Sequence, residues 1–226
     1  MMSTGSQWLW LSLEWKRYIA AVNRKLKSQG RPPIFRYHAT DCANYINDFE
    51  GWSKHEQIDL VKGLFGILRR HPTNSIAYVT DLNDVCEVFP KHEKDRLHAG
   101  YTVLTTYVMY QILMDCKAQD GHVKQVVLFH DRNPYDNAMQ DAFKLMVQDP
   151  EYNAFFPSLT PMSSEHCIPL QPADLVAYEM FKEAHRKLSG RNRRKSLEGL
   201  LSLESFGIRS KTLTKDALLS IRKRMP

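Results

Sequence analysis

The stretch Pro169-Leu170-Gln171-Pro172-Ala173-Asp174-Leu175-Val176-Ala177-Tyr178-Glu179 predicts the start of a helix that carries a carboxylate inward. Pro172 suits the first helical position, because an N–H there would have no intrahelical partner. Gln171 is then expected at the cap and Asp174 in the first turn, where the helix dipole favours an anion. Apolar residues follow at once, and a carboxylate beside them needs a cation, a hydrogen-bond network or a divalent metal. An ordinary N-terminal helix acid is the alternative that stays open.

Helical and strand-like patterns alternate along the chain and predict an α/β sandwich. Apolar spacings of three and four, with a capping box at Ser53-Lys54-His55-Glu56, predict helices. They cover residues 7–27, 54–68, 101–116, 134–147 and 170–188. Short apolar runs predict strands at 34–38, 75–80 and 123–129, whereas 85–89 fits a strand or a lid-like loop. Residues 155–168 are expected to be irregular or weakly extended, and 197–225 to form one or two small helices.

The run Val126-Val127-Leu128-Phe129 is typical of a strand buried on both faces, and Asp131 follows at its C-terminal end. A carboxylate in that place suits a functional site. The ordinary alternative is turn and helix-cap chemistry, because Arg132-Asn133-Pro134 comes next.

The totals fit one domain, or one domain with an appendage, because the chain has 226 residues of which 43% are hydrophobic. No apolar run approaches the roughly 20 residues that a membrane helix needs, which predicts no membrane partner. No secretory signal is recognisable at the N-terminus. The four cysteines are widely separated, which favours reduced thiols in a cytoplasmic protein.

The net charge of +6 is unevenly distributed. Residues 182–226 hold 13 Lys/Arg against 4 Asp/Glu, whereas residues 1–181 hold 18 against 21. Such a basic end is able to neutralise phosphates, although a solvated tail has the same composition. The candidate nucleic-acid-binding residues are Arg186, Lys187, Arg191, Arg193, Arg194 and Lys195.

Four elements occur in an order that resembles a known family. They are Tyr37-His38-Ala39-Thr40-Asp41, Phe49-Glu50-Gly51-Trp52, the strand ending in His130-Asp131, and Leu170-Gln171-Pro172-Ala173-Asp174-Leu175. Together they resemble a family of bacterial and phage proteins catalogued as domain of unknown function number thirty-eight hundred, which is similar to ribonuclease H in fold. The likeness runs from about Trp8 to Leu188, and the Leu-Gln-x-Ala-Asp-Leu element is its most specific part.

The resemblance implies a ribonuclease H-like mixed sheet flanked by helices, over residues 1–189. Residues 190–226 would form a basic, helical C-terminal extension. The family usually opens with a strand ending in Asp-Glu-Ser-Gly, and this chain shows no such strand. A late start codon, a shortened variant or a partner chain would each account for the missing N-terminal strands. We therefore expect an open sheet edge beside Val126–Phe129, covered in a homodimer or by another chain.

Enzymes with this fold hold Mg²⁺ or Mn²⁺ on carboxylates, and two such ions about 4 Å apart drive phosphodiester hydrolysis. The resemblance implies that Asp131 and Asp174 are catalytic metal ligands and that Asp41 is a further ligand. His38 would lie near these ligands. Glu179 is roughly 140° around the helix from Asp174, so it is expected to face elsewhere and to support the ligands only indirectly. The carboxyl groups of Asp131 and Asp174 should then lie within roughly 10 Å of each other.

The implied function is a divalent-metal-dependent nuclease, in phage or bacterial defence biology. Because the first acid of the family is missing, we expect the 226-residue form to be nearly inactive. The alternative is a non-catalytic nucleic-acid-binding or interaction protein that keeps the fold without a complete metal site. A zinc site and a Cys42–His38 nucleophile pair are weaker options, because the spacing of His38, Cys42 and His166-Cys167 is unlike common zinc motifs.

Overall fold

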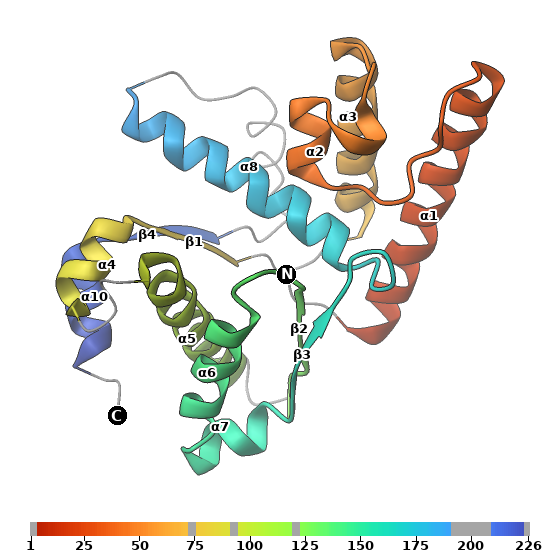
Figure 1. Cartoon of the computed structure of the whole chain (residues 1–226). Coiled ribbons are helices and arrows are strands. Elements are labelled where there is room, and N and C mark those ends of the chain that lie inside the picture. Colours follow the sequence, from red (N-terminus) through yellow and green to blue (C-terminus); the bar gives the residue numbers. More distant parts are fainter. Residues whose placement is uncertain (1–3, 72–75, 91–94, 119–122, 191–208, 224–226) are drawn as a thin grey trace. The chain divides into compact units, whose positions relative to one another are not determined.

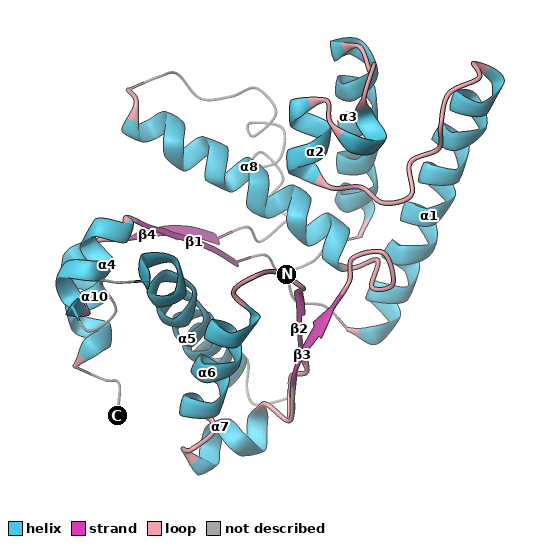
Figure 2. Cartoon of the chain, in the orientation of Figure 1, coloured by secondary structure: helices cyan, strands magenta, loops and turns pink. Residues whose placement is uncertain are grey.

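Helices make up most of the structure, a computed structural model that describes residues 4–71, 76–90, 95–118, 123–190 and 209–223 (Figure 2). The expected mixed α/β class is confirmed at this level, while a ribonuclease H-like arrangement stays a prediction. The chain forms two units that each join distant segments. The first unit is Met1–Ala77 with Ser163–Ser210, and the second is Tyr78–Met162 with Lys211–Pro226. The expected division at residue 190 also stays a prediction.

The first unit is helical. Its elements are α1 (Gly5–Ser28), α2 (Ala39–Asn44), the 3₁₀ turn η1 (Asn47–Phe49), α3 (Lys54–Arg70) and α8 (Leu170–Leu188). Helix α1 packs against α3, and α2 lies beside α8 (Figure 1). The predicted capping box at Ser53 and Glu56 is confirmed at the start of α3, and Thr4 with Gln7 forms another at α1. Both boxes satisfy N–H groups that the first helical turn leaves unpaired.

The core of the first unit follows a line of edge-to-face aromatic rings. Ring centres of Trp15 and Tyr37 are 6.0 Å apart, those of Tyr37 and Phe49 are 6.2 Å apart, and those of Phe49 and Trp52 are 5.3 Å apart. Apolar residues from α1, α3 and α8 complete this core. Tyr37 is buried and contacts both Trp15 and Phe49, so the position of the backbone just before His38 is fixed.

Residues 34–38 were expected as a strand, and this expectation is wrong. The segment is irregular. Its backbone N–H groups bond to side chains instead of a neighbouring strand: Ile34 donates to Asn23 Oδ1 at 2.8 Å, and Phe35 donates to Asp48 Oδ2 at 2.8 Å. Because these side chains satisfy the backbone, the segment needs no neighbouring strand, and Ile34 and Tyr37 are buried while Phe35 is exposed.

The second unit combines short strands with helices, and the strands at 76–80 and 209–213 each begin with two residues of the first unit. Its elements are β1 (Ile76–Thr80), α4 (Leu82–Val88), α5 (Arg96–Ala118), β2 (Leu128–Asp131), α6 (Asp136–Met146), α7 (Pro150–Phe155), β3 (Leu159–Met162), β4 (Arg209–Leu213) and α10 (Lys215–Arg222). Strand β1 confirms the prediction for 75–80 and pairs with β4. Residues 85–89, expected as a strand or loop, belong mostly to α4, because Asp81 caps that helix by accepting from Asn83 N–H.

Strand β2 pairs in parallel with β3, in the register Leu128 with Leu159 and Asp131 with Met162. A strand is present in the region where 123–129 predicted one, but β2 covers only Leu128–Asp131, and the expected burial on both faces is wrong, because Val127 and Phe129 are 50% and 51% exposed. The reason is one-sided pairing, since within the described part of the chain β3 is the strand bonded to β2. The open edge that the sequence predicts is therefore present there.

Helix α8 has the predicted bounds, but its start differs in detail. It begins at Leu170, so Gln171 lies inside the helix instead of capping it, and the first turn contains no acid. Leu170 N–H donates to Cys167 O and Gln171 N–H donates to Ile168 O, so the residues before Pro172 already turn. Asp174 is thus one turn into the helix, where contacts with other segments decide its surroundings.

Candidate functional site

Gln171 joins three segments of the first unit through one buried amide. Its Oε1 accepts from Trp15 Nε1 at 2.9 Å and from Tyr37 N–H at 3.1 Å, and its Nε2 donates to Ser164 O at 2.8 Å. The residue is only 2% exposed. A buried amide has to satisfy its donors and acceptors locally, and Gln171 does so with α1, with the segment before α2 and with the turn before α8. Sequence reasoning assigned it only a cap.

Asp174 binds the start of α2. Its Oδ2 accepts from the backbone N–H of Ala39 at 2.7 Å, across 135 positions of sequence. The residue that would cap α2, His38, makes no side-chain cap bond. Asp174 therefore supplies from α8 an acceptor that the first turn of α2 needs. Through Gln171 and Asp174, α8 holds residues 37–39, and so the Leu-Gln-x-Ala-Asp-Leu and His-Ala-x-Asp elements meet in one place.

His38 and Asp41 form a polar pair on α2. His38 Nδ1 lies 3.0 Å from Asp41 Oδ1, and Asn47 Nδ2 donates to Asp41 Oδ2 at 2.9 Å. Burial acts to raise the pKa of Asp41, but the bonds from Asn47 and His38, with the charge of Arg36, outweigh it and lower the pKa. Asn47 has a φ of 55°, a left-handed conformation that costs energy in a non-glycine residue. The residue with the strained backbone, Asn47, is thus the one that donates to the carboxylate of Asp41.

Tyr37 and Cys42 flank this pair in the sequence and are both buried. The charge of Lys182 acts on Cys42. Burial raises the pKa of Tyr37 well above 10.0, and the charges of Asp174 and Glu179 raise it further. Burial also raises the pKa of the Cys42 thiol to about 12, although Lys182 and a hydrogen bond with Tyr37 act in the opposite direction. Cys42 is therefore protonated at neutral pH, which argues against the nucleophile pair.

Helix α8 carries two further charged residues of interest, the buried Glu179 and Lys182, whose ammonium lies over an aromatic ring. Glu179 is 5% exposed, and its charge acts on Tyr37; its supporting role stays a prediction. Lys182 was missed by sequence reasoning. Its Nζ lies 4.2 Å from the centre of the Tyr178 ring, a cation–π contact that holds the ammonium in place. The i, i+4 spacing of Tyr178 and Lys182 was a signal that would have found it.

Asp131 lies in the second unit, at the C-terminal end of β2. Its backbone carbonyl takes part in a turn with the residues that follow: Asn133 Nδ2 donates to Asp131 O at 3.0 Å, and Asn133 N–H donates to Asp136 Oδ1 at 3.0 Å. His130 Nδ1 lies 3.5 Å from Asp136 Oδ1. This is the turn chemistry that the sequence offered as the ordinary alternative. Asp131 and Asp174 belong to different units, so their approach within roughly 10 Å stays a prediction.

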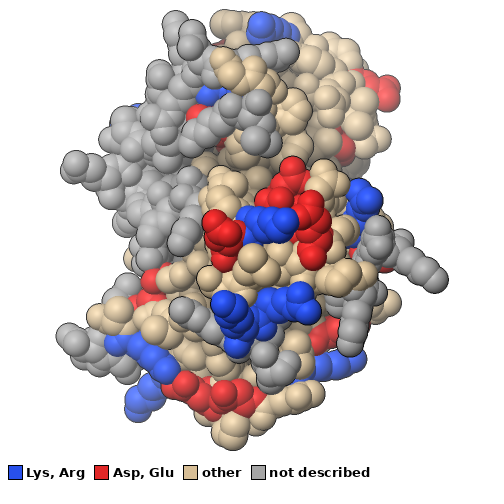
Figure 3. Space-filling view, turned by 90° about the vertical axis from the view of Figure 1, so that its left-hand side faces the viewer, with Lys and Arg blue, Asp and Glu red and all other residues tan. Residues whose placement is uncertain are grey.

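The basic candidates lie mostly outside the described residues. These are Arg191, Arg193, Arg194 and Lys195, together with the side chain of Lys187. Arg186 pairs with Glu183, and its side chain is 11% exposed, so this guanidinium is already engaged. On the face shown in Figure 3, the described Lys and Arg side chains lie among Asp and Glu side chains instead of forming one continuous patch.

Two findings concern the described residues as a whole. They contain no group of three or more His, Cys, Asp or Glu side chains placed to hold a metal ion. They also contain no helix with the length and apolarity required to cross a membrane.

Comparison with protein-family models finds no match, and comparison with curated proteins and with solved structures finds no significant similarity. The resemblance drawn from the four sequence elements therefore stays an expectation, and function has to be argued from the site itself.

Proposed function

We propose that this chain is a divalent-metal-dependent nuclease that hydrolyses phosphodiester bonds. The observation that carries the proposal is the hydrogen bonding of α8 to residues 37–39, through Gln171 and Asp174. It supports the proposal because it brings together the two sequence elements on which the resemblance most depends. His38, Asp41 and Asp174 are thereby fixed around the start of one short helix.

The carboxylates of the first unit suit hard cations chemically. Asp174 Oδ2 and both oxygens of Asp41 already accept hydrogen bonds or face an imidazole, but an ionised carboxylate has about four lone-pair sites and accepts further ligands. The low pKa of Asp41 keeps it ionised at neutral pH. In this proposal Asp131, Asp174 and Asp41 hold Mg²⁺ or Mn²⁺, which would activate water and stabilise the leaving oxygen.

The other residues of the site act by positioning. Gln171 accepts from the backbone N–H of Tyr37 and thereby helps to fix the position of the next residue, His38. Asn47 orients Asp41, and His38 faces the other oxygen of the same carboxylate. Glu179 and Tyr37 are both buried, and the charge of Glu179 helps to keep the Tyr37 hydroxyl protonated. As part of the same proposal the protein acts in the cytoplasm, which its four free cysteines support.

A second candidate is a nucleic-acid-binding or interaction protein without catalysis. A specific observation favours it: Asp174 has a structural task as the acceptor for α2, so its presence does not require chemistry. In this alternative the acids are parts of the fold, and the basic end supplies the affinity.

The experiment is a cleavage assay with Mg²⁺ or Mn²⁺ on labelled single- and double-stranded DNA and RNA. Asp131→Asn and Asp174→Asn each keep a side-chain oxygen acceptor and remove the charge. Cleavage by the unchanged protein is expected to be slow, and both variants should lower its rate at least about 100-fold or abolish it, since each would remove a metal ligand. Asp149→Asn is the matched control, because Asp149 caps α7 and has no place in the site. Binding without cleavage by the unchanged protein would select the second candidate.

A further inference from the structure

Phe35 is the most exposed large hydrophobic side chain among the described residues, at 78%. It lies between Ile34, which is 2% exposed, and Arg36, and three positions before His38. An isolated apolar side chain on a surface is ordinary in itself. What sets Phe35 apart is the backbone that carries it.

The backbone around Phe35 is fixed on both sides. Asn23 binds both polar groups of Ile34, with Asn23 Nδ2 donating to Ile34 O at 2.9 Å. Asp48 Oδ2 accepts from Phe35 N–H at 2.8 Å and lies 3.5 Å from Arg36 N. Tyr37 N–H then donates to the buried amide of Gln171. The segment that carries the ring is already ordered in the folded protein, so binding at the ring would cost little further conformational entropy.

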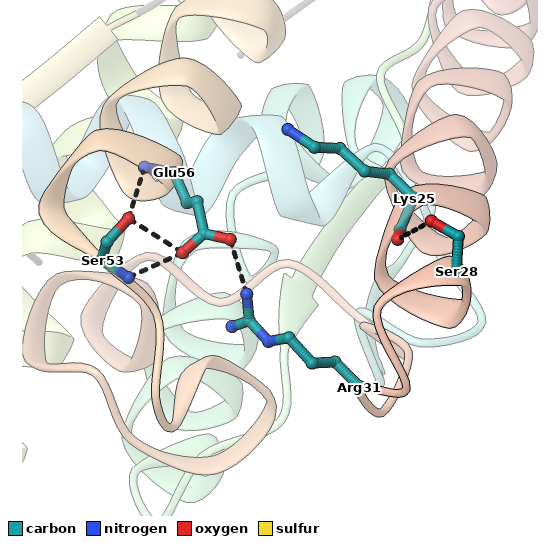
Figure 4. Close-up of polar contacts among 5 residues, drawn as sticks. All are labelled: Lys25, Ser28, Arg31, Ser53 and Glu56. Atoms are coloured by element: carbon teal, nitrogen blue, oxygen red, sulfur yellow. Dashed lines mark hydrogen bonds and ion pairs between the residues drawn. The ribbon is translucent and has the colours of Figure 1, made fainter.

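The start of the same segment is anchored as well. Arg31 Nη1 donates to Glu56 Oε1 at 2.5 Å (Figure 4). The Arg31 guanidinium also lies 5.3 Å from the centre of the Trp52 ring. Glu56 also accepts from Ser53, which completes the capping box of α3. The segment from Arg31 to Tyr37 is therefore attached to α1, α3, α8 and the loop at Asp48, yet its one aromatic ring outside the core faces solvent.

The surroundings of Phe35 favour a nucleic acid over a protein partner. Its sequence neighbours on the surface are Pro32, Pro33 and Arg36, so the ring has a cation next to it in sequence. A single rigid aromatic ring beside an arginine is the arrangement that binds an unstacked base and the adjoining phosphate. Three residues of extended chain span at most about 11 Å, so Phe35 lies close to His38 and the proposed site.

We propose that Phe35 is a stacking platform for one base of a single-stranded nucleic acid, with Arg36 contacting the phosphate beside it. This inference rests on the proposed function and names its substrate as single-stranded. A base inside a duplex has no free face to offer, so the platform selects strands whose bases are unpaired. Stacking is tolerant of sequence, because every base has a π face.

The test measures binding of the full chain to a fluorescein-labelled oligodeoxythymidine of about 16 nucleotides, the upper end of single-strand site sizes. Divalent metal is omitted, so that no cleavage occurs. We expect Phe35→Ala and Phe35→Leu each to weaken binding about tenfold, and Phe35→Trp to retain it, because only an aromatic ring stacks. Phe35→Trp should also show fluorescence quenched by the oligonucleotide. The matched control is Phe181→Ala, which removes another exposed phenyl ring of the same unit, 58% exposed on α8.

Circular dichroism melting curves should be alike for all these variants, since the removed rings are exposed. Unchanged binding by Phe35→Ala, with normal binding by the unchanged protein, overturns the inference and leaves the proposed function to the cleavage assay. Wild-type affinity in Phe35→Leu, or an unquenched Phe35→Trp, also overturns it and favours a protein partner at this ring. Absence of both binding and cleavage in the unchanged protein overturns the proposed function itself.

Discussion

The two acids that matter most to the proposed function are held in opposite ways. Asp174, in the first unit, binds a backbone N–H that lies 135 positions away. Asp131, in the second unit, is surrounded by groups from the next five residues, such as Asn133. Asp174 thus bonds to a helix far away in sequence, whereas the backbone of Asp131 takes part both in the pairing of β2 with β3 and in a local turn. Equal changes at the two acids should therefore affect function similarly and stability differently.

The largest effect is expected at Gln171, which organises the first unit. Gln171→Ala would leave Trp15 Nε1, Tyr37 N–H and Ser164 O without their common partner. We expect the free energy of unfolding to fall by about 3–5 kcal/mol, because each buried group left unsatisfied costs about 1–3 kcal/mol. Denaturant titration measures this.

The control for Gln171 comes from the second unit. Gln140 donates a single bond from its Nε2 to Leu159 O, at 3.1 Å. Gln140→Ala should cost about 1 kcal/mol, the net value of one ordinary hydrogen bond. Equal losses for the two glutamines would remove the distinction between a side chain that joins segments and one that only bonds to a neighbour.

A smaller but more direct contrast is expected between the acids. Asp174→Ala should lower the free energy of unfolding by about 2 kcal/mol, because it removes a charge-assisted acceptor from the start of α2. Asp131→Ala should lower it by less, about 1 kcal/mol, because the substitution keeps the backbone carbonyl that Asn133 binds. Thermal and denaturant unfolding of both variants give the comparison. If Asp131→Ala is the more damaging of the two, the local description of its turn is wrong.

The pH dependence of stability should sharpen the description of the first unit. The pKa of Asp41 is lowered in the folded protein, so its contribution is complete above the ordinary value of 3.8 and is lost as the pH falls through the folded value. Asp41→Asn should remove this part of the acid destabilisation. Glu14 and Glu56 also have lowered pKa values and remain in the variant, so the difference between the two stability curves is the quantity to measure. Curves that stay parallel below pH 3.8 would contradict the bonding of Asp41 to Asn47 and His38.

The smallest effect concerns the basic end. Changing Arg191, Arg193, Arg194 and Lys195 together to alanine should make the affinity for nucleic acid less dependent on salt, by about 0.7 in the logarithmic slope for each single-strand phosphate contact removed. Binding titrations at three salt concentrations measure that slope. The four residues lie outside the described part of the chain, so the result would show whether this end participates at all.

Local chemistry was enough to predict much of this molecule from its sequence. The Ser53–Glu56 capping box and the bounds of α8 follow from contacts within a few residues, and both are confirmed. The turn after Asp131 is also local, and the sequence offered it as the ordinary alternative. Such features depend on backbone groups that neighbouring side chains are able to satisfy, so their signals are present in short stretches.

Tertiary structure decided the rest, because the partners involved are far apart in sequence. The apolar run at 34–38 reads as a strand, but Asn23, Asp48 and Gln171 take its N–H groups and leave it irregular. Likewise Asp174 reads as an acid of the first turn and instead serves another helix. A sequence shows which side chains are able to accept a hydrogen bond. Only the folded chain decides which distant donor each one meets, since that depends on how the helices pack around Tyr37.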